Sequence, residues 1–102
     1  MKTLKWKRNK KPIVEKRRLQ YDLVENNKYE SNIVIGSIWL SSNGEWMYEI
    51  KDDWDWLEVN TLKDAKKEFL EVIREYYSDE LDYFHAGIEE LEEYLELIDN
   101  LI

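Results

Sequence analysis

Residues 33–50 read IVIGSIWLSSNGEWMYEI, two apolar runs joined by a polar segment. The first run is apolar on both faces, which is typical of a strand in the middle of a sheet. Asn43-Gly44 between apolar runs is the strongest short-range signal for a β-hairpin. In the returning run Trp46, Tyr48 and Ile50 fall on one face, so that face is expected to be buried. The stretch therefore predicts an antiparallel pair of strands.

One more strand is expected before this hairpin and one after it. Residues 19–23 (LQYDL) alternate apolar and polar side chains, which predicts a half-buried strand with Leu19 on its apolar face. Asn26-Asn27 suits the turn that follows, because Asn tolerates a left-handed backbone. After the hairpin, Asp52-Asp53 predicts another turn and residues 54–59 a short fourth strand.

The apolar period changes to that of a helix after residue 60. Thr61 followed by Asp64 approximates a capping box, with Asp where Glu is usual. Residues 61–77 are expected to form an amphipathic helix. Its apolar positions are Leu62, Ala65, Phe69, Val72, Ile73 and Tyr76.

A second helix is expected to begin at Ser78, whose hydroxyl suits an N-cap. Its apolar residues step along the chain by three and four, and Gly87 lies one residue off this seam, where a kink is expected. The seam is Leu81, Phe84, Ile88, Leu91, Leu95, Ile98 and Ile102. The predicted fold class is therefore α+β, a four-stranded antiparallel β-sheet followed by two C-terminal helices packed on it.

Charge divides the chain into two unequal parts. The first 18 residues hold nine basic side chains and one acid, a formal charge of +8, and the rest carries −16, which gives the net −8. Residues 1–12 end at Pro12 without a sustained period, so we expect a basic N-terminal arm before a single α+β domain over 13–102. The arm is a candidate for contact with nucleic acid, with a partner protein, or with the acidic face of its own domain. The contact candidates are Lys5, Trp6, Lys7, Arg8, Lys10, Lys11, Arg17 and Arg18.

The C-terminal part is acidic throughout. No Lys or Arg follows Arg74, and the last 28 residues carry ten acidic side chains. The like-charge pairs Glu89–Glu93 and Glu92–Glu96 each destabilise a helix by about 0.2–0.5 kcal/mol. One interpretation is a solvated face that keeps the protein soluble, and another is a surface for basic partners in general.

A third interpretation is mimicry of nucleic acid. Residues four apart on a helix rise about 6 Å, so a row of carboxylates has the spacing order of phosphates and fits a groove lined by Lys and Arg. The partner-binding candidates are Asp79, Glu80, Asp82, Glu89, Glu90, Glu92, Glu93, Glu96 and Asp99.

Composition argues against catalysis. Cysteine is absent and His85 is the only histidine, so the usual nucleophile–base sets and transition-metal sites have no residues to form them. Residues 52–56 (DDWDW) place three carboxylates in one turn but lack the calcium-loop pattern. Trp54 and Trp56 are expected at the core and rim of the sheet, and the alternative is an exposed tryptophan that anchors an interface. We expect no catalytic residue, metal or cofactor. With no long apolar run and no secretory h-region, a cytoplasmic location is expected and no membrane contact.

In length, in the absence of cysteine and in the carboxylate-rich stretch 79–99, the chain resembles small acidic phage and mobile-element proteins that inhibit host defence. Anti-CRISPR proteins and anti-restriction DNA mimics are the groups concerned, and the composition is typical of low-GC Gram-positive bacteria and their phages. The resemblance implies a stoichiometric inhibitor that blocks the nucleic-acid site of a CRISPR effector nuclease or a restriction enzyme. The basic arm departs from that pattern, since the best-known DNA mimics are acidic throughout.

A second resemblance concerns the start of the first expected helix. Thr61-Leu62-x-x-Ala65 is similar to the helix opening of some small antitoxins with a strand–strand–strand–helix core. The resemblance implies an antitoxin-like protein. Together with the basic arm it gives the alternative function, a small nucleic-acid-binding regulator or antitoxin-like protein that uses this arm. Monomer and homodimer both remain open at this point.

Overall fold

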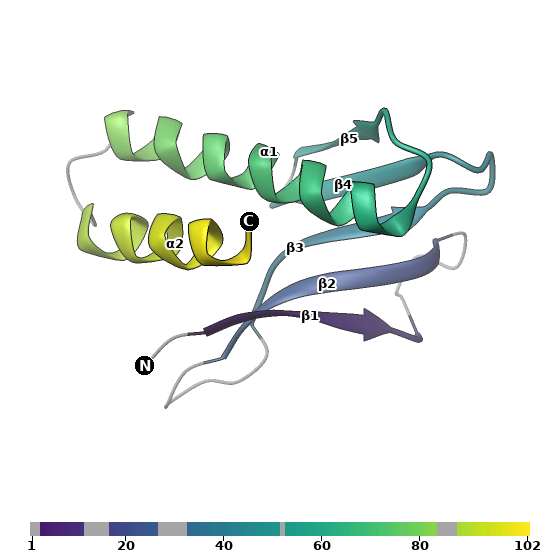
Figure 1. The fold of residues 1–102 in the computed structure, drawn as a ribbon, viewed down its shortest axis with the longest axis horizontal. Coiled ribbons are helices and arrows are strands. Elements are labelled where there is room, and N and C mark those ends of the chain that lie inside the picture. Colours follow the sequence, from purple (N-terminus) through teal and green to yellow (C-terminus); the bar gives the residue numbers. More distant parts are fainter. Residues whose placement is uncertain (1–2, 12–16, 27–32, 52, 84–87) are drawn as a thin grey trace.

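The computed structural model describes residues 3–11, 17–26, 33–51, 53–83 and 88–102, without the side chains of residues 80–91. A five-stranded antiparallel sheet in the order β1-β2-β3-β4-β5 is followed by two helices (Figure 1). The strands are β1 (Thr3–Asn9), β2 (Arg18–Asn26), β3 (Ile33–Leu40), β4 (Trp46–Ile50) and β5 (Asp53–Leu57). The helices are α1 (Leu62–Tyr83) and α2 (Ile88–Leu101). The α+β class is confirmed, with five strands instead of the four expected.

The additional strand comes from the residues that we expected to be an arm. β1 pairs with β2 along its length, with Trp6 opposite Leu23. Leu4 is buried, and the Trp6 ring packs edge-on against Phe69 at 5.5 Å between centroids. The expectation of an arm was wrong because the basic residues masked a period of two, in which Lys5 and Lys7 alternate with these apolar side chains. Lysine on an edge strand is a common device against pairing with a further strand.

The central hairpin is confirmed. β3 lies in the middle of the sheet. The Ser41 carbonyl accepts the Gly44 N–H at 3.0 Å, and the Ser41 N–H donates to the Glu45 carbonyl at 2.8 Å. Gly44 has φ of 81°, a left-handed conformation that glycine adopts without steric cost. Trp46 and Ile50 are buried on the expected face of β4.

One expectation for β2 was wrong. The pairing of β2 with β3 shifts register between Arg18 and Tyr21, and Leu19 there has φ of 47°. An irregularity of this kind re-aims a side chain, so Leu19 is 42% exposed and not on the apolar face, whereas Leu23 is fully buried. The turns predicted at Asn26-Asn27 and at Asp52-Asp53 each include one residue, Asn27 or Asp52, that lies outside the described residues.

The first helix begins as predicted and ends later. The Asp64 N–H donates to Thr61 Oγ1 at 3.1 Å, which is the expected cap. α1 then continues through Ser78 to Tyr83, so Ser78 is a residue inside the helix and not the start of a second one. Tyr77 is buried and stacks on Tyr94 of α2 at 5.2 Å, which gives the helix a packing partner at this point. Gly87, the expected kink, lies outside the described residues.

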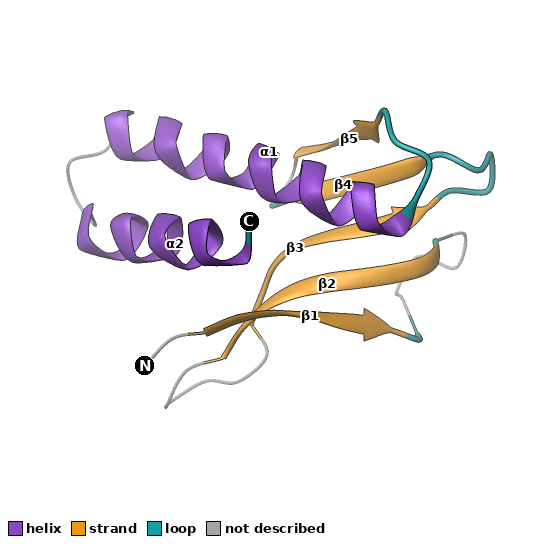
Figure 2. Cartoon of the chain, in the orientation of Figure 1, coloured by secondary structure: helices purple, strands orange, loops and turns teal. Residues whose placement is uncertain are grey.

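Both helices lie on the same side of the sheet, here called its first face (Figures 1 and 2). Phe69 and Ile73 of α1 and Ile98 of α2 are fully buried against it. The hydroxyl of Tyr94 donates to the carboxylate of Glu25, which ties α2 to β2. Ile102, the last residue of the predicted seam, is 56% exposed because α2 ends at Leu101.

The opposite side of the sheet is here called its second face. Residues directly opposite one another in paired strands project to the same side, and one such row crosses all five strands. It consists of Lys7, Asp22, Ser37, Glu49 and Trp54. A shorter row, Trp39, Met47 and Trp56, lies beside it. Neither helix covers this face (Figure 2).

Candidate binding surfaces

The acidic residues are divided between the two helices. Asp79, Glu80 and Asp82 belong to α1, and the other partner-binding candidates belong to α2. The expectation that all of them lie on one helix beginning at Ser78 was therefore wrong. Of the residues whose side chains are described, Asp79, Glu92, Glu93, Glu96 and Asp99 are exposed. The side chains of Glu80, Asp82, Glu89 and Glu90 lie outside the described part.

On α2 the exposed carboxylates have a regular arrangement. Glu92, Glu96 and Asp99 stand four and three residues apart, which places them on one stripe of the helix; we call these three residues the acidic stripe. Ile98 faces the core on the other side of the same helix. The Arg74 Nε donates to Asp99 Oδ1 at 2.6 Å, so the stripe has one member bound to a cation of α1.

The basic residues of the expected arm are held by the sheet. Lys5 and Lys7 are exposed on the second face. An open hollow of about 450 Å³ is lined in part by four cationic residues, and Asp22 and Val24 also belong to its lining. The four are Lys7, Arg8, Lys10 and Lys11, and we call this the basic hollow. Trp6 does not belong to this surface, since it packs against Phe69.

Arg17 and Arg18 make specific contacts with β3, β4 and the loop between these two strands. The Arg17 guanidinium lies 3.7 Å from the centroid of the Trp39 ring and binds Glu49 Oε2 at 2.9 Å. Arg18 donates to the Ser41 carbonyl at 2.9 Å. Cation–π stacking with a planar guanidinium is a common arrangement, and here it covers a tryptophan that is only 7% exposed.

The second face also presents an aromatic surface, which the core-and-rim expectation for Trp54 and Trp56 did not include. Trp54 and Trp56 are 67% and 53% exposed, so the expectation of a core tryptophan in β5 was wrong. An open hollow of about 360 Å³ is lined in part by Arg17, Trp39 and Trp54; we call it the aromatic hollow. The alternation DWDW was the available signal, because it places both tryptophans on one side of a strand.

The acidic residues of β5 project to the other side. Asp55 is directly opposite Tyr48, whose ring packs near Phe69 on the first face. Burial, together with the negative charges of Asp55 and then Asp53, raises the pKa of the Tyr48 phenol above its ordinary value. Asp55 also remains close to the tryptophans along the chain, since its Oδ1 accepts the Trp56 backbone N–H at 2.8 Å.

A buried polar cluster lies on the second face between the two hollows. Asp22 is 8% exposed and accepts from Ser37 at 2.7 Å, from Gln20 at 2.9 Å and from Asn9 at 3.2 Å. Such bonds stabilise a buried carboxylate. Among the described residues, Gln20 Oε1 is the buried side-chain atom that has no hydrogen-bond partner.

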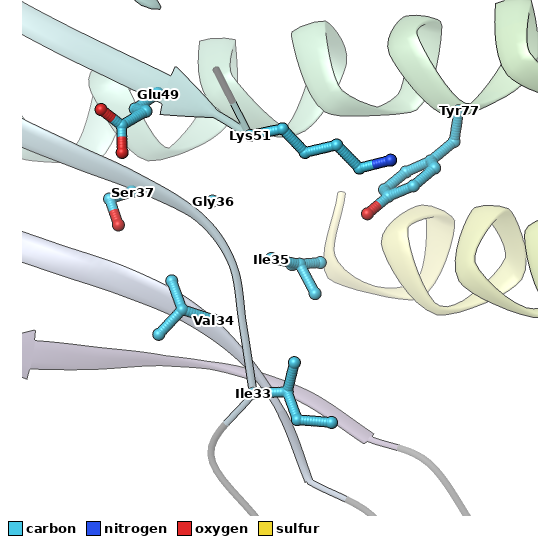
Figure 3. Close-up of a pocket in the computed structure, with 8 residues that line it drawn as sticks. All are labelled: Ile33, Val34, Ile35, Gly36, Ser37, Glu49, Lys51 and Tyr77. Carbon is cyan, nitrogen blue, oxygen red and sulfur yellow. The ribbon is translucent and has the colours of Figure 1, made fainter. Parts of the chain in front are cut away.

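A further cavity of about 370 Å³ lies beside β3, where that strand extends past its pairing with β4 (Figure 3). Lys51 extends toward Tyr77 across it, and aliphatic side chains of β3 form another part of its wall. Ser37 at its edge donates to Asp22, and no histidine lies in its described lining. The described residues contain no group of three acidic, histidine or cysteine side chains placed to hold a metal ion.

Comparison of the chain with protein-family models, curated proteins and solved structures gave no match. Neither helix, over the residues that are described, combines the length and apolarity required to cross a membrane.

Proposed function

We propose that the protein is a non-enzymatic inhibitor that binds a basic, nucleic-acid-handling protein through the acidic surface of α2. The partner class is a host-defence enzyme, a CRISPR effector nuclease or a restriction enzyme in a bacterial cytoplasm. One observation carries the proposal: Glu92, Glu93 and Glu96 are exposed on a helix that contains no basic residue. An ordinary solvated helix has cations at i+4 that offset its carboxylates.

The packing of α2 supports this use. Three contacts fix α2 against the sheet and α1: buried Ile98, the Tyr94–Glu25 hydrogen bond and the Tyr77–Tyr94 stack. A helix fixed in this way presents its carboxylates without a further loss of conformational freedom on binding. The electrostatic repulsion between the glutamates of α2 is reduced when the Lys and Arg residues of a partner groove come close.

The test is a charge reversal with a matched control. Glu92→Lys, Glu93→Lys and Glu96→Lys together should lower capture of the partner from nuclease-treated lysate of a low-GC Gram-positive host by at least about tenfold, or ~1.4 kcal/mol. The control reverses the same charge on α1, at exposed Glu68, Glu71 and Glu75. Equal capture by the wild type and the α2 variant, with circular dichroism showing both folded, would refute the proposal.

The alternative function is a small nucleic-acid-binding regulator that acts through the basic N-terminal residues. The basic hollow favours it, because its lining includes four cationic residues at and just after the end of β1. Deletion of residues 1–11 is no suitable test of this idea, since the deletion removes β1. Lys10→Gln with Lys11→Gln leaves β1 in place and should weaken binding to DNA or RNA at low salt.

A further inference from the structure

The second face of the sheet carries lysines at its β1 edge and exposed tryptophans at its β5 edge. The row that crosses the sheet begins at Lys7 on β1 and ends at Trp54 on β5. Four strand spacings of about 4.8 Å give a path of roughly 19 Å between them. The basic hollow lies at the first end and the aromatic hollow at the second.

Exposed tryptophans at this density call for an explanation. Large aromatic side chains are usually buried, and neighbouring exposed ones mark interaction sites. Trp54 and Trp56 stand two residues apart on β5, and their partners across the β4 pairing are Glu49 and Met47. The Glu49 carboxylate is bound by Arg17, so its negative charge is offset at this end of the path.

We infer that the second face binds single-stranded nucleic acid, with unpaired bases on Trp54 and Trp56 and the phosphate backbone toward the basic hollow. Aromatic platforms beside a basic groove are the chemistry that binds unpaired strands without sequence preference. Two features favour this ligand. The positive charges of Lys7, Lys10 and Lys11 favour an anionic ligand, and the tryptophan rings favour a ligand with flat rings that stack on them.

A duplex fits this face less well. Its bases are stacked within the helix and present only their edges, so they cannot lie flat on Trp54. The inference deepens the alternative function, nucleic-acid binding, and does not depend on the acidic surface of α2. The two surfaces belong to different parts of the fold, α2 on the first face and the tryptophans on the second.

The experiment measures binding of the full chain to a labelled dT oligonucleotide of about 12 nucleotides and to a duplex of equal length, at about 50 and 200 mM salt. We expect the single strand to bind more tightly than the duplex. Trp54→Leu and Trp56→Leu should each weaken binding roughly fivefold to 150-fold, the effect of removing one stacked base. Trp54→Tyr and Trp56→Tyr, which keep a flat ring, should retain most of the affinity. Lys10→Gln with Lys11→Gln should reduce the salt slope by about 0.7 for each phosphate that these lysines neutralise in the wild type.

The possible outcomes distinguish the inference of single-strand binding from the alternative function, nucleic-acid binding in general. No binding to either oligonucleotide at low salt overturns both this inference and the alternative function. A preference for duplex, or affinity unchanged by the leucine variants, overturns the inference alone and leaves the basic residues as a general anion surface. A homodimer that the leucine variants dissociate, without oligonucleotide binding, would assign the tryptophans to self-association and also overturn it. The α2 charge-reversal variant should bind the oligonucleotide at least as well as the wild type, because it removes negative charge.

Discussion

The Arg74 guanidinium donates from Nε to Oδ1 of Asp99 at 2.6 Å, and this ion pair joins α1 to the last turn of α2. Both side chains are about half exposed, so solvent screens the pair and its contribution is ~0.2–1 kcal/mol. No Lys or Arg follows Arg74 in the chain. Asp99 is therefore the member of the acidic stripe whose charge is already offset, and it serves as an internal control for the others.

Removal of the Asp99 charge should have little effect. Asp99→Asn should lower the free energy of unfolding by less than about 1 kcal/mol, measured by urea denaturation. It should leave partner capture unchanged, whereas the triple reversal at Glu92, Glu93 and Glu96 should lower capture by at least about tenfold. If Asp99→Asn reduces capture as strongly as the triple variant, the expectation that the Asp99 carboxylate contributes little to partner binding is wrong.

The N-terminal strand should contribute to stability like any core element. Leu4→Ala removes a side chain that is 8% exposed in the sheet, and such truncations lower the free energy of unfolding by about 2–5 kcal/mol. Lys5→Ala, at the exposed neighbouring position, should change it by less than about 0.5 kcal/mol. Equal and small effects of both substitutions would return residues 3–9 to the status of an arm.

Close packing between β3 and α1 can be tested with Gly36 and Phe69. A methyl group at Gly36 would overlap the Phe69 ring, so Gly36→Ala should destabilise the fold by about 1–3 kcal/mol. In a Phe69→Leu background the same substitution should cost less, because the smaller side chain leaves room. A double-mutant cycle by thermal or urea denaturation measures the difference. Additive effects would mean that the two residues are not in contact.

Alkaline pH should reveal the environment of Tyr48. Its pKa is raised above 10.0 in the folded protein, so its neutral form is favoured and its contribution to stability is complete below that pH. As the pH rises from 10.0 toward the folded-state pKa, the unfolded chain ionises first and that contribution is lost. Tyr48→Phe should therefore show a shallower fall in the free energy of unfolding above about pH 10 than the wild type. Identical slopes would contradict the raised pKa.

Local sequence signals predicted the centre of this fold better than its ends. Asn43-Gly44 and the apolar run of β3 determine a hairpin by backbone preference and burial, and both were read correctly. β1 was missed because the two side chains that it packs into the core, Leu4 and Trp6, are separated by lysine within a strongly basic stretch. The end of α1 was missed because Ser78 suits either a cap or a helix interior, and the stacking of Tyr77 on Tyr94 is a long-range contact.

The surfaces were harder to predict than the elements. The charge of each residue was evident, but its position depended on strand pairing. Lys7 and Trp54 are 47 positions apart in the chain and lie on one row only because four strand pairs are in a particular register. Exposure of Trp54 and Trp56 also depends on the tertiary fold, because both helices cover the opposite face of the sheet.

The most direct test of the central claim is displacement of nucleic acid from the captured partner. A labelled oligonucleotide is bound to the isolated partner, and wild-type protein is added up to a molar excess. If the acidic surface of α2 occupies the partner's nucleic-acid groove, the label should be released at about one equivalent of the wild type. The Glu92→Lys, Glu93→Lys, Glu96→Lys variant should need a concentration at least about tenfold higher for the same release. Simultaneous binding of both ligands to the partner would contradict the proposed inhibitor mechanism.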